Sequence, residues 1–264
     1  MGGFISYNEY KNALNETFES FQELKILAKD LFGAFDKTLK IQGTQDKFYT
    51  QFKKNQIYYI KRIVKRKFKV IDEFVNSSIA IIRSDSEAFS RGSYVQPQDY
   101  HEIKSILPDR AIPELQQIYP NGIIVIYVFD INVIIHELEH AYDDFRAKGK
   151  LTKTKMGYRF EDKYRKFSKI SSPEEKSKYY EGPFLRTYYR TPHEMSAFFT
   201  KALNMISFFR DKEELILREF QDVYEDFKDN FQGYNYLTPK DKKILLRKFS
   251  QYYYKMKERN IAEE

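Results

Sequence analysis

The sequence of 264 residues contains no cysteine and no tryptophan. Without cysteine, the chain can form neither disulfide bonds nor a metal site with thiolate ligands. Long apolar runs are absent too, because the longest one, from Ile123 to Ile135, is interrupted by Asp130 and Asn132. A transmembrane helix needs roughly 18 or more apolar residues in a row, so we expect a soluble protein. The first residues also lack the basic and apolar regions of a secretory signal.

The overall composition is that of an ordinary soluble chain with one unusual segment. Hydrophobic residues make up 42% of the sequence and charged residues 31%, as in globular proteins. The 23 Phe and 22 Tyr residues, with abundant Lys, Asn and Ile, suggest an AT-rich bacterial or phage genome. The net charge of +7 is uneven, since residues 47–71 contain no acid. Basic side chains of this segment include Lys53, Lys54, Lys61, Arg62, Lys65, Arg66, Lys67 and Lys69.

Apolar residues at helical spacing predict a long helix over Tyr7–Phe35. A second helix is predicted over Asp46–Asn76, with Gly43 in the loop between them. The two would form a helical hairpin, and we assign residues 1–76 to an N-terminal domain that can dock a protein partner. The apolar seam of the first helix repeats every seven residues, at Tyr7, Leu14, Phe21, Ala28 and Phe35.

The basic segment falls on the second predicted helix. Lys61, Lys65 and Lys69 share one helical stripe, with Arg62 and Arg66 beside it. Clustered positive charge of this kind can contact a phosphate backbone. The solvated face of an amphipathic helix is the commoner reason for such a pattern, so we expect no nucleic-acid partner.

Residues 77–264 predict an α+β domain that is predominantly helical and contains a small sheet. Short β-rich runs occur at Ser78–Ile82 and at Gly122–Phe129. Asp130 is the predicted N-cap of a helix over Ile131–Lys148, and Gly149 follows where a glycine commonly ends a helix. Further helices are predicted to begin at three hydroxyl–proline pairs, Ser172-Pro173, Thr191-Pro192 and Thr238-Pro239.

The sequence His136-Glu137-Leu138-Glu139-His140 places two histidines four residues apart on a predicted helix. Residues at this spacing share a face, so both imidazoles can reach one metal ion. Glu137 is offset by one position and can take a proton from a water molecule that the metal acidifies. The alternative is a solvated helix face with two incidental histidines.

A catalytic zinc site needs a third protein ligand. The best candidate is Glu194, which opens the helix after Thr191-Pro192 and precedes Ala197 by three residues. Thr191 and Glu194 also fit a capping box, which needs no metal, so both roles for Glu194 stay open. His193 is the rival third ligand.

Four further residues are candidates for supporting roles. Asp143 and Asp144 follow His140 by three and four positions, where a carboxylate can hold an imidazole N–H. Solvated helix acids would give the same pattern. Tyr188 or Tyr189 can donate a hydrogen bond to the oxyanion of a tetrahedral intermediate, and the sequence does not distinguish the two.

At these residues the chain resembles the gluzincin branch of zinc metallopeptidases. The segment from His136 to Phe145 is similar to the zinc-binding helix of the anthrax lethal factor catalytic domain, and Glu194-Met195-Ser196-Ala197 is similar to its third-ligand segment. The combination also resembles metallopeptidase-like proteins encoded by phages. Phe198 stands where thermolysin-like enzymes have an aspartate, so a close thermolysin relative is not expected. The resemblance implies a zincin-like fold, Zn2+ as cofactor, His136, His140 and Glu194 as ligands, Glu137 as base and a tyrosine as oxyanion donor.

Two functions follow from this interpretation. The first is peptide-bond hydrolysis, with a peptide or protein substrate paired along the edge of the Gly122–Phe129 strand. The second is a zincin-fold structural or assembly protein, for instance of a phage particle, that lacks peptidase turnover. We expect a cytoplasmic location, which would be the host cytoplasm or the virion if a phage encodes the chain. No membrane contact is expected.

Overall fold

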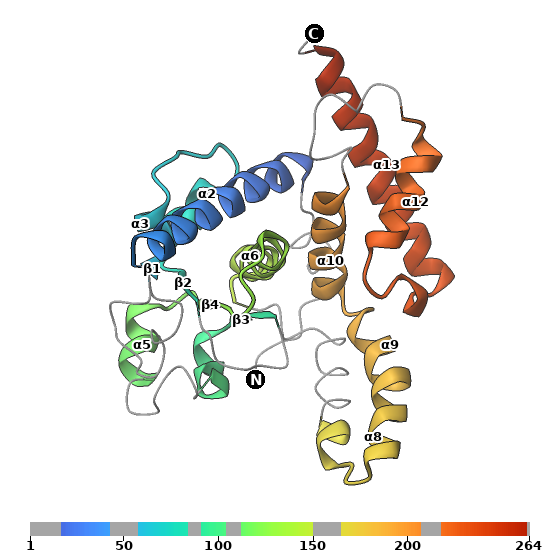
Figure 1. The fold of residues 1–264 in the computed structure, drawn as a ribbon, viewed down its shortest axis with the longest axis horizontal. Helices are drawn as coiled ribbons and strands as arrows, with labels where there is room; N and C mark the ends of the chain where they lie inside the picture. The colour runs from blue at the N-terminus through green and yellow to red at the C-terminus, as the bar shows by residue number, and fades with distance from the viewer. Residues whose placement is uncertain are drawn as a thin grey trace. The chain divides into compact units, whose positions relative to one another are not determined.

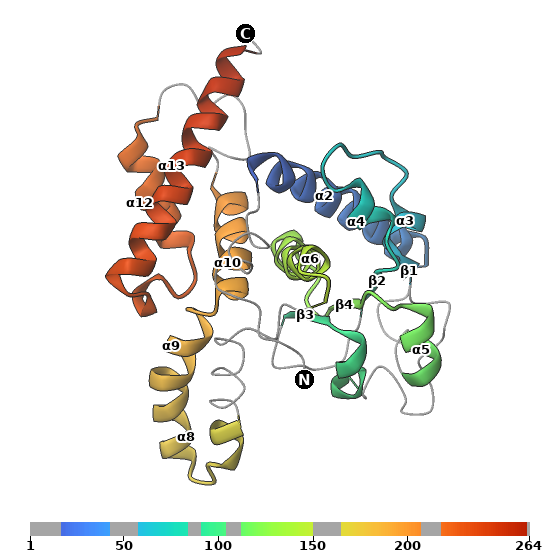
Figure 2. The ribbon, with the colours of Figure 1, turned by 180° about the vertical axis from the view of Figure 1, so that it is seen from behind.

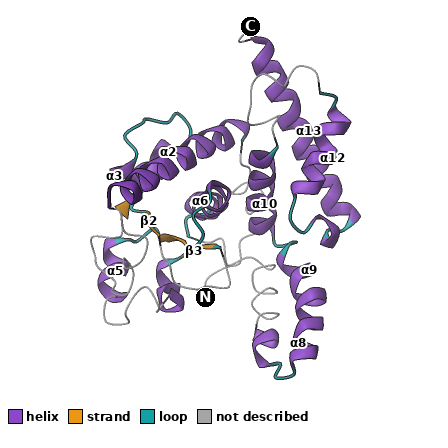
Figure 3. Ribbon diagram, in the orientation of Figure 1, coloured by secondary structure: helices purple, strands orange, loops and turns teal. Residues whose placement is uncertain are grey.

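The computed structural model describes residues 17–42, 58–83, 91–103, 112–149, 165–206 and 218–262. These residues are mostly helical with one small sheet, which confirms a predominantly helical α+β fold (Figure 3). The chain forms two compact units, one of Glu19–Gly149 and one that combines Met1–Phe18 with Lys150–Glu264. The functional division into residues 1–76 and 77–264 stays a prediction. None of the described helices combines the length and the apolar character that a membrane span requires.

Helix α2 spans Phe18–Gln42, so the predicted first helix is confirmed where it is described and continues past Phe35. The predicted positions 7–16 lie outside the described residues. Of the described seam positions, Phe21 and Ala28 have no exposed surface, as expected, and Phe35 is partly buried. Leu24 and Leu31, beside the seam, are fully buried together with Ala28. Leu24, Ala28 and Leu31 belong to the larger hydrophobic core of the first unit.

The prediction of a second hairpin helix over Asp46–Asn76 is wrong for the part of it that the structure describes. Residues 58–76 form a two-residue strand, β1 (Tyr58–Tyr59), a single helical turn, α3 (Ile60–Ile63), a stretch without regular secondary structure, and the short helix α4 (Asp72–Asn76). The carboxylate of Glu23 on α2 accepts hydrogen bonds from three successive backbone N–H groups, at residues 69–71, over 2.8–3.0 Å. These bonds hold the backbone in a non-helical conformation. The remainder of this arm, residues 46–57, lies outside the described residues.

A mixed sheet in the order β1-β2-β4-β3 forms the centre of the first unit (Figure 1). Strand β2 (Ala80–Arg83) pairs with β1 in the antiparallel sense and with β4 (Ile123–Ile126) in the parallel sense. Strand β3 (Gly92–Val95) is antiparallel to β4, with Gly92 opposite Ile126. Both predicted strands are therefore present, although the Gly122–Phe129 run contributes only four residues, and β3 was not predicted.

The two faces of the sheet are covered by different helices, as Figures 1 and 2 show. Ile81, Ile124 and Ile126 pack with α2 and with α6 (Ile131–Arg146). Residues of the opposite face, such as Ile82 and Val125, pack with α5 (Ile112–Ile118) and the 3₁₀ segment η2 (Pro97–Ile103). This alternation along each strand is the two-residue period of a β-strand covered on both faces.

The helix α6 begins at Ile131, as the sequence predicts, and ends at Arg146, two residues before the predicted end. Its N-cap, Asp130, accepts a hydrogen bond from the backbone N–H of Asn132 at 2.8 Å through its side chain. Gly149 has a φ of +69°, in the left-handed region that favours glycine after a helix. Both signals fix the position of the two histidines along the helix.

The second unit is helical and has an aromatic core. It contains α8 (Pro173–Tyr179), a π-helical turn η5 (Tyr180–Phe184), α9 (Leu185–Tyr188), α10 (Pro192–Met205), α12 (Phe220–Asn230), the 3₁₀ turn η6 (Tyr234–Tyr236) and α13 (Pro239–Ala262). The three predicted proline starts, of α8, α10 and α13, are confirmed. Phe199 of α10 packs on Phe227 of α12 at 5.3 Å between ring centroids, and Phe227 packs on Phe249 of α13 at 4.9 Å.

Candidate metal centre

The two histidines of α6 lie on one face and point their rings at the same place. Their Nε2 atoms are 3.1 Å apart, and the ring centroids are 4.6 Å apart with the planes nearly perpendicular. Both residues are only 9% exposed, so the alternative of a solvated helix face with incidental histidines is wrong. Two buried imidazoles with converging nitrogens are the arrangement that a shared metal ion requires.

Glu194 completes a group of three buried ligands. One nitrogen each of His136 and His140 and one carboxylate oxygen of Glu194 all lie within 4.8 Å of one another. Among the residues that the structure describes, no other set of three or more His, Cys, Asp or Glu side chains gathers in this way. Two imidazoles and a carboxylate are a donor set that zinc binds well, and the set leaves a fourth position for water or substrate. The residues therefore fit a metal of this class.

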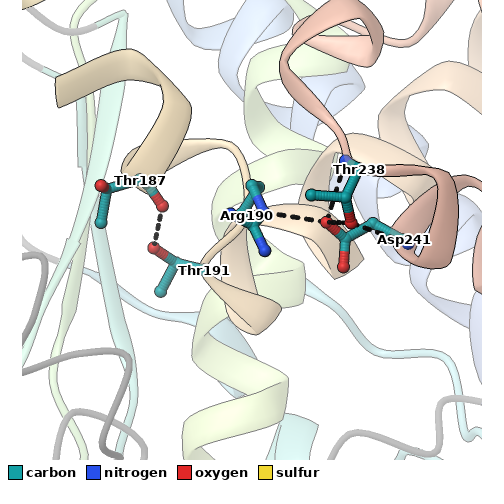
Figure 4. Close-up of polar contacts among 5 residues, drawn as sticks. All are labelled: Thr187, Arg190, Thr191, Thr238 and Asp241. Atoms are coloured by element: carbon teal, nitrogen blue, oxygen red, sulfur yellow. Dashed lines mark hydrogen bonds and ion pairs between the residues drawn. The ribbon is translucent and has the colours of Figure 1, made fainter. Parts of the chain in front are cut away.

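The capping box that was the alternative role for Glu194 lacks the hydrogen bond that Thr191 would have to accept. Thr191 is the N-cap residue of α10, but its side chain makes no capping hydrogen bond. Its hydroxyl instead donates to the backbone carbonyl of Thr187 at 2.9 Å, as Figure 4 shows. The rival ligand His193 lies with its Nε2 atom 3.9 Å from the Glu194 carboxylate and is not a member of the three-ligand group.

A polar network fixes the start of the helix that carries Glu194 (Figure 4). The Nε atom of Arg190 donates to Asp241 Oδ2 at 2.8 Å. Thr238 donates hydrogen bonds to the Asp241 carboxylate through its backbone N–H and its hydroxyl group. The backbone N–H of Asp241 donates in return to the Thr238 hydroxyl, so the two residues form a capping box at the start of α13. The segment before α10 is thus tied to α13. The Thr-x-x-Asp spacing of this box is visible in the sequence, but its link to Arg190 is not.

Glu137 lies against the strand β3. The side chain is 5% exposed. A Cβ atom at Gly92 would stand 2.9 Å from Glu137 Cγ and 3.0 Å from Glu137 Oε1, so the glutamate side chain runs directly over the Gly92 backbone. Tyr127, just after β4, is a second neighbour: burial raises its pKa, and the negative charge of Glu137 raises it further. Sequence reasoning missed both neighbours.

The two acids after His140 are buried rather than solvated. Asp143 is fully buried and Asp144 is 5% exposed, so the alternative of solvated helix acids is wrong. Asp144 Oδ2 accepts a hydrogen bond from the Tyr94 hydroxyl of β3 at 2.9 Å. Burial raises the pKa of Tyr94 well above its usual value, and the negative charge of Asp144 raises it further. A direct bond from either acid to an imidazole stays a prediction.

The two candidate tyrosines have different surroundings. Tyr189 is 7% exposed, its ring stacks on Tyr236 at 5.4 Å, and its hydroxyl accepts a hydrogen bond from Gln232 Nε2 at 3.1 Å. The pKa of Tyr189 lies above the usual tyrosine value, mainly because the side chain is buried. The hydrogen bond from Gln232 lowers this pKa, whereas nearby groups that include Glu194 raise it. Tyr188 stacks on Phe184 at 6.4 Å. The oxyanion role of one of the two tyrosines stays a prediction, and the choice between Tyr188 and Tyr189 stays open.

The basic residues do not form the predicted helical stripe. Helix α3 ends at Ile63, so Lys65 and Lys69 lie outside it. Arg66 is paired with Asp30 of α2 at 3.2 Å. Lys61 lies over the ring of Tyr59, with its Nζ atom 5.1 Å from the centroid. The predicted stripe is wrong because the second helix on which it depended is interrupted, and the absence of a nucleic-acid partner stays a prediction.

Comparison with known proteins does not assign the chain to a family. No family model matches it, and no curated protein and no solved structure matches it either. The observations establish a mostly helical protein with a small sheet and a buried His136–His140–Glu194 group that can hold a metal ion.

Proposed function

We propose that the chain is a gluzincin-like zinc peptidase in which His136, His140 and Glu194 hold the metal and Glu137 is the general base. The observation that carries the proposal is the buried group of three ligands, with Glu137 one position away from the first histidine. Zinc, when bound by such a set, polarises a carbonyl group and lowers the pKa of a water molecule to about 7. The sequence resemblance to gluzincins supports the same assignment.

Glu137 moves the proton in this mechanism. Its carboxylate removes a proton from the attacking water as the oxygen adds to the carbonyl carbon of the peptide. The same carboxyl group then returns the proton to the amide nitrogen, and the carbon–nitrogen bond breaks. General acid–base catalysis of this kind contributes typically about 100- to 10,000-fold to the rate. The low exposure of Glu137 keeps bulk water from competing for that proton.

The expected substrate edge must be reassigned from the Gly122–Phe129 run to β3. Strand β4 lies between β2 and β3, so both of its edges are paired. In the part of the chain that the structure describes, β3 has a strand neighbour on one side alone. The Arg91 carbonyl accepts from Tyr127 N–H at 3.0 Å, which marks these two residues as a hydrogen-bonded pair. Because such pairs alternate along an antiparallel ladder, Gly92 and Tyr94 direct their N–H and C=O groups away from β4, where an extended peptide can pair.

The experiment compares wild-type protein with Glu137→Gln on a mixed peptide library. Glutamine is nearly isosteric but cannot accept the proton, so we expect unchanged zinc content and a loss of cleavage of about 100- to 10,000-fold. Glu114→Gln, the same change at an exposed position of α5, is the control and should cleave like the wild type. No turnover by zinc-loaded wild type would favour the alternative, a zincin-fold structural or assembly protein. Activity that survives intact in Glu137→Gln would place the chemistry elsewhere.

A further inference from the structure

The edge strand β3 is fastened to α6 at two places along the helix. At the start of α6, the guanidinium of Arg91 pairs with the N-cap carboxylate of Asp130 at 3.0 Å. Near its end, the Tyr94 hydroxyl lies 2.9 Å from Asp144 Oδ2. Only Gly92 and Ser93 lie between Arg91 and Tyr94, so this short stretch of chain contacts the helix at both of its ends.

Gly92 lies between these anchors and passes close to α6. A Cβ atom there would stand 2.7 Å from Val133 Cγ1, 2.9 Å from Glu137 Cγ and 3.0 Å from Glu137 Oε1. Carbon atoms pack at about 3.5–4.0 Å, so any side chain at this position requires a shift of the strand or of both neighbours. Gly92 is not among the glycines with positive φ, which means that space rather than backbone conformation requires glycine. A glycine inside a strand commonly marks such a close approach.

We infer that Gly92 is a positioning residue for the Glu137 carboxylate. Its bare backbone forms the wall along which the glutamate side chain lies, and that wall belongs to the strand whose outward N–H and C=O groups would bind the peptide. This contact therefore links the position of the Glu137 carboxylate to the strand that would hold the peptide. The catalytic consequence rests on the proposed peptidase function, whereas the packing consequence does not.

The first test is kinetic. Gly92→Ala should lower kcat by about 10- to 100-fold, the size expected for a misplacement of about 1 Å, with a smaller change in KM. In the Glu137→Gln background the same substitution should cause no further loss, because the side chain that it displaces no longer acts as base. Gly33→Ala on α2 is the matched control, since a Cβ atom at Gly33 meets nothing within 4 Å and should leave kcat unchanged. Equal loss from Gly92→Ala in both backgrounds would overturn the inference.

The second test needs no activity and separates this inference from the proposed function. Gly92→Ala should lower the melting temperature of the metal-free protein, and Glu137→Ala or Val133→Ala should restore part of that loss when combined with it. Gly33→Ala should leave the melting temperature unchanged or raise it. If the wild type cleaves no peptide but the thermal losses couple in this way, the peptidase proposal fails and the contact stands. Strictly additive losses would overturn the role of Gly92.

Discussion

At the scale of single residues, the proposed metal ligand His136 and the proposed base Glu137 are neighbours on α6. His136 and His140 are one helical turn apart and bring their Nε2 atoms to 3.1 Å. Glu137, which follows directly, lies instead along Gly92 of β3. Substitution of the glutamate should therefore change the chemistry and leave the ligand geometry intact.

Tyr189→Phe tests the oxyanion role at this scale. The Tyr189 hydroxyl accepts a hydrogen bond from Gln232, which leaves its own proton to donate to a substrate oxygen. We expect kcat for peptide cleavage to fall by about 100- to 1,000-fold, as for removal of one oxyanion donor, while zinc content stays unchanged. Tyr188→Phe is the matched control and should lose much less. A larger loss in Tyr188→Phe would assign the role to Tyr188.

Local patterns predicted most of the proposed site, and long-range pairing explains what they missed. His136, Glu137 and His140 are found from helical spacing, which is a property of five consecutive residues. Gly92 and Tyr94 reach α6 only because β3 pairs with β4, about thirty residues further along the chain. No local signal near residue 92 reports that pairing.

At the scale of elements, the position of α10 depends on the first turn of α13. Burial raises the pKa of Asp241, but hydrogen bonds from Thr238 and Arg190 lower it by more, so the net pKa lies below the usual value. The folded state therefore favours the carboxylate form. By linkage, this contribution to stability is present above the ordinary aspartate pKa of about 4 and is lost as pH falls through the lower pKa of the folded state.

Asp241→Asn should reproduce that loss at neutral pH. We expect the free energy of unfolding to fall by about 1 kcal/mol at pH 7, as for loss of a helix cap, and the difference from wild type to shrink below about pH 4. Urea unfolding between pH 3 and 7 measures it. Asp222→Asn, an exposed acid in the first turn of α12, is the control and should show a smaller difference. A difference for Asp241→Asn that stays constant over the whole range would contradict the linkage.

Elements with their own start signals were predictable, whereas elements shaped by distant side chains were not. The hydroxyl–proline pairs before α8, α10 and α13 all mark helix starts. The second helix of the predicted hairpin is interrupted, because the backbone N–H groups of residues 69–71 donate hydrogen bonds to the Glu23 carboxylate, some forty-five residues earlier in the chain. The apolar residues Ile60, Val64 and Phe68 of this segment are buried, although no continuous helix carries them.

At the scale of the whole molecule, composition and periodicity predicted a mostly helical α+β chain, and the described residues confirm it. Composition and periodicity do not determine the order of the strands in the sheet. The run at residues 122–129 reads equally well as a central or an edge strand, because each of its four paired residues is apolar and buried. The proposed substrate edge on β3 therefore rests on the strand order in the structure and not on the sequence.

The metal content of the purified protein tests the central claim most directly. We expect one zinc ion per chain in the wild type and a loss of at least tenfold in His136→Ala, His140→Ala and Glu194→Ala, measured by elemental analysis after dialysis. Circular dichroism should show that each variant keeps its helices, and Glu114→Ala, which changes an exposed glutamate, should keep its zinc. Full zinc in Glu194→Ala alone would reject the third ligand. Full zinc in both histidine variants would contradict the metal centre itself.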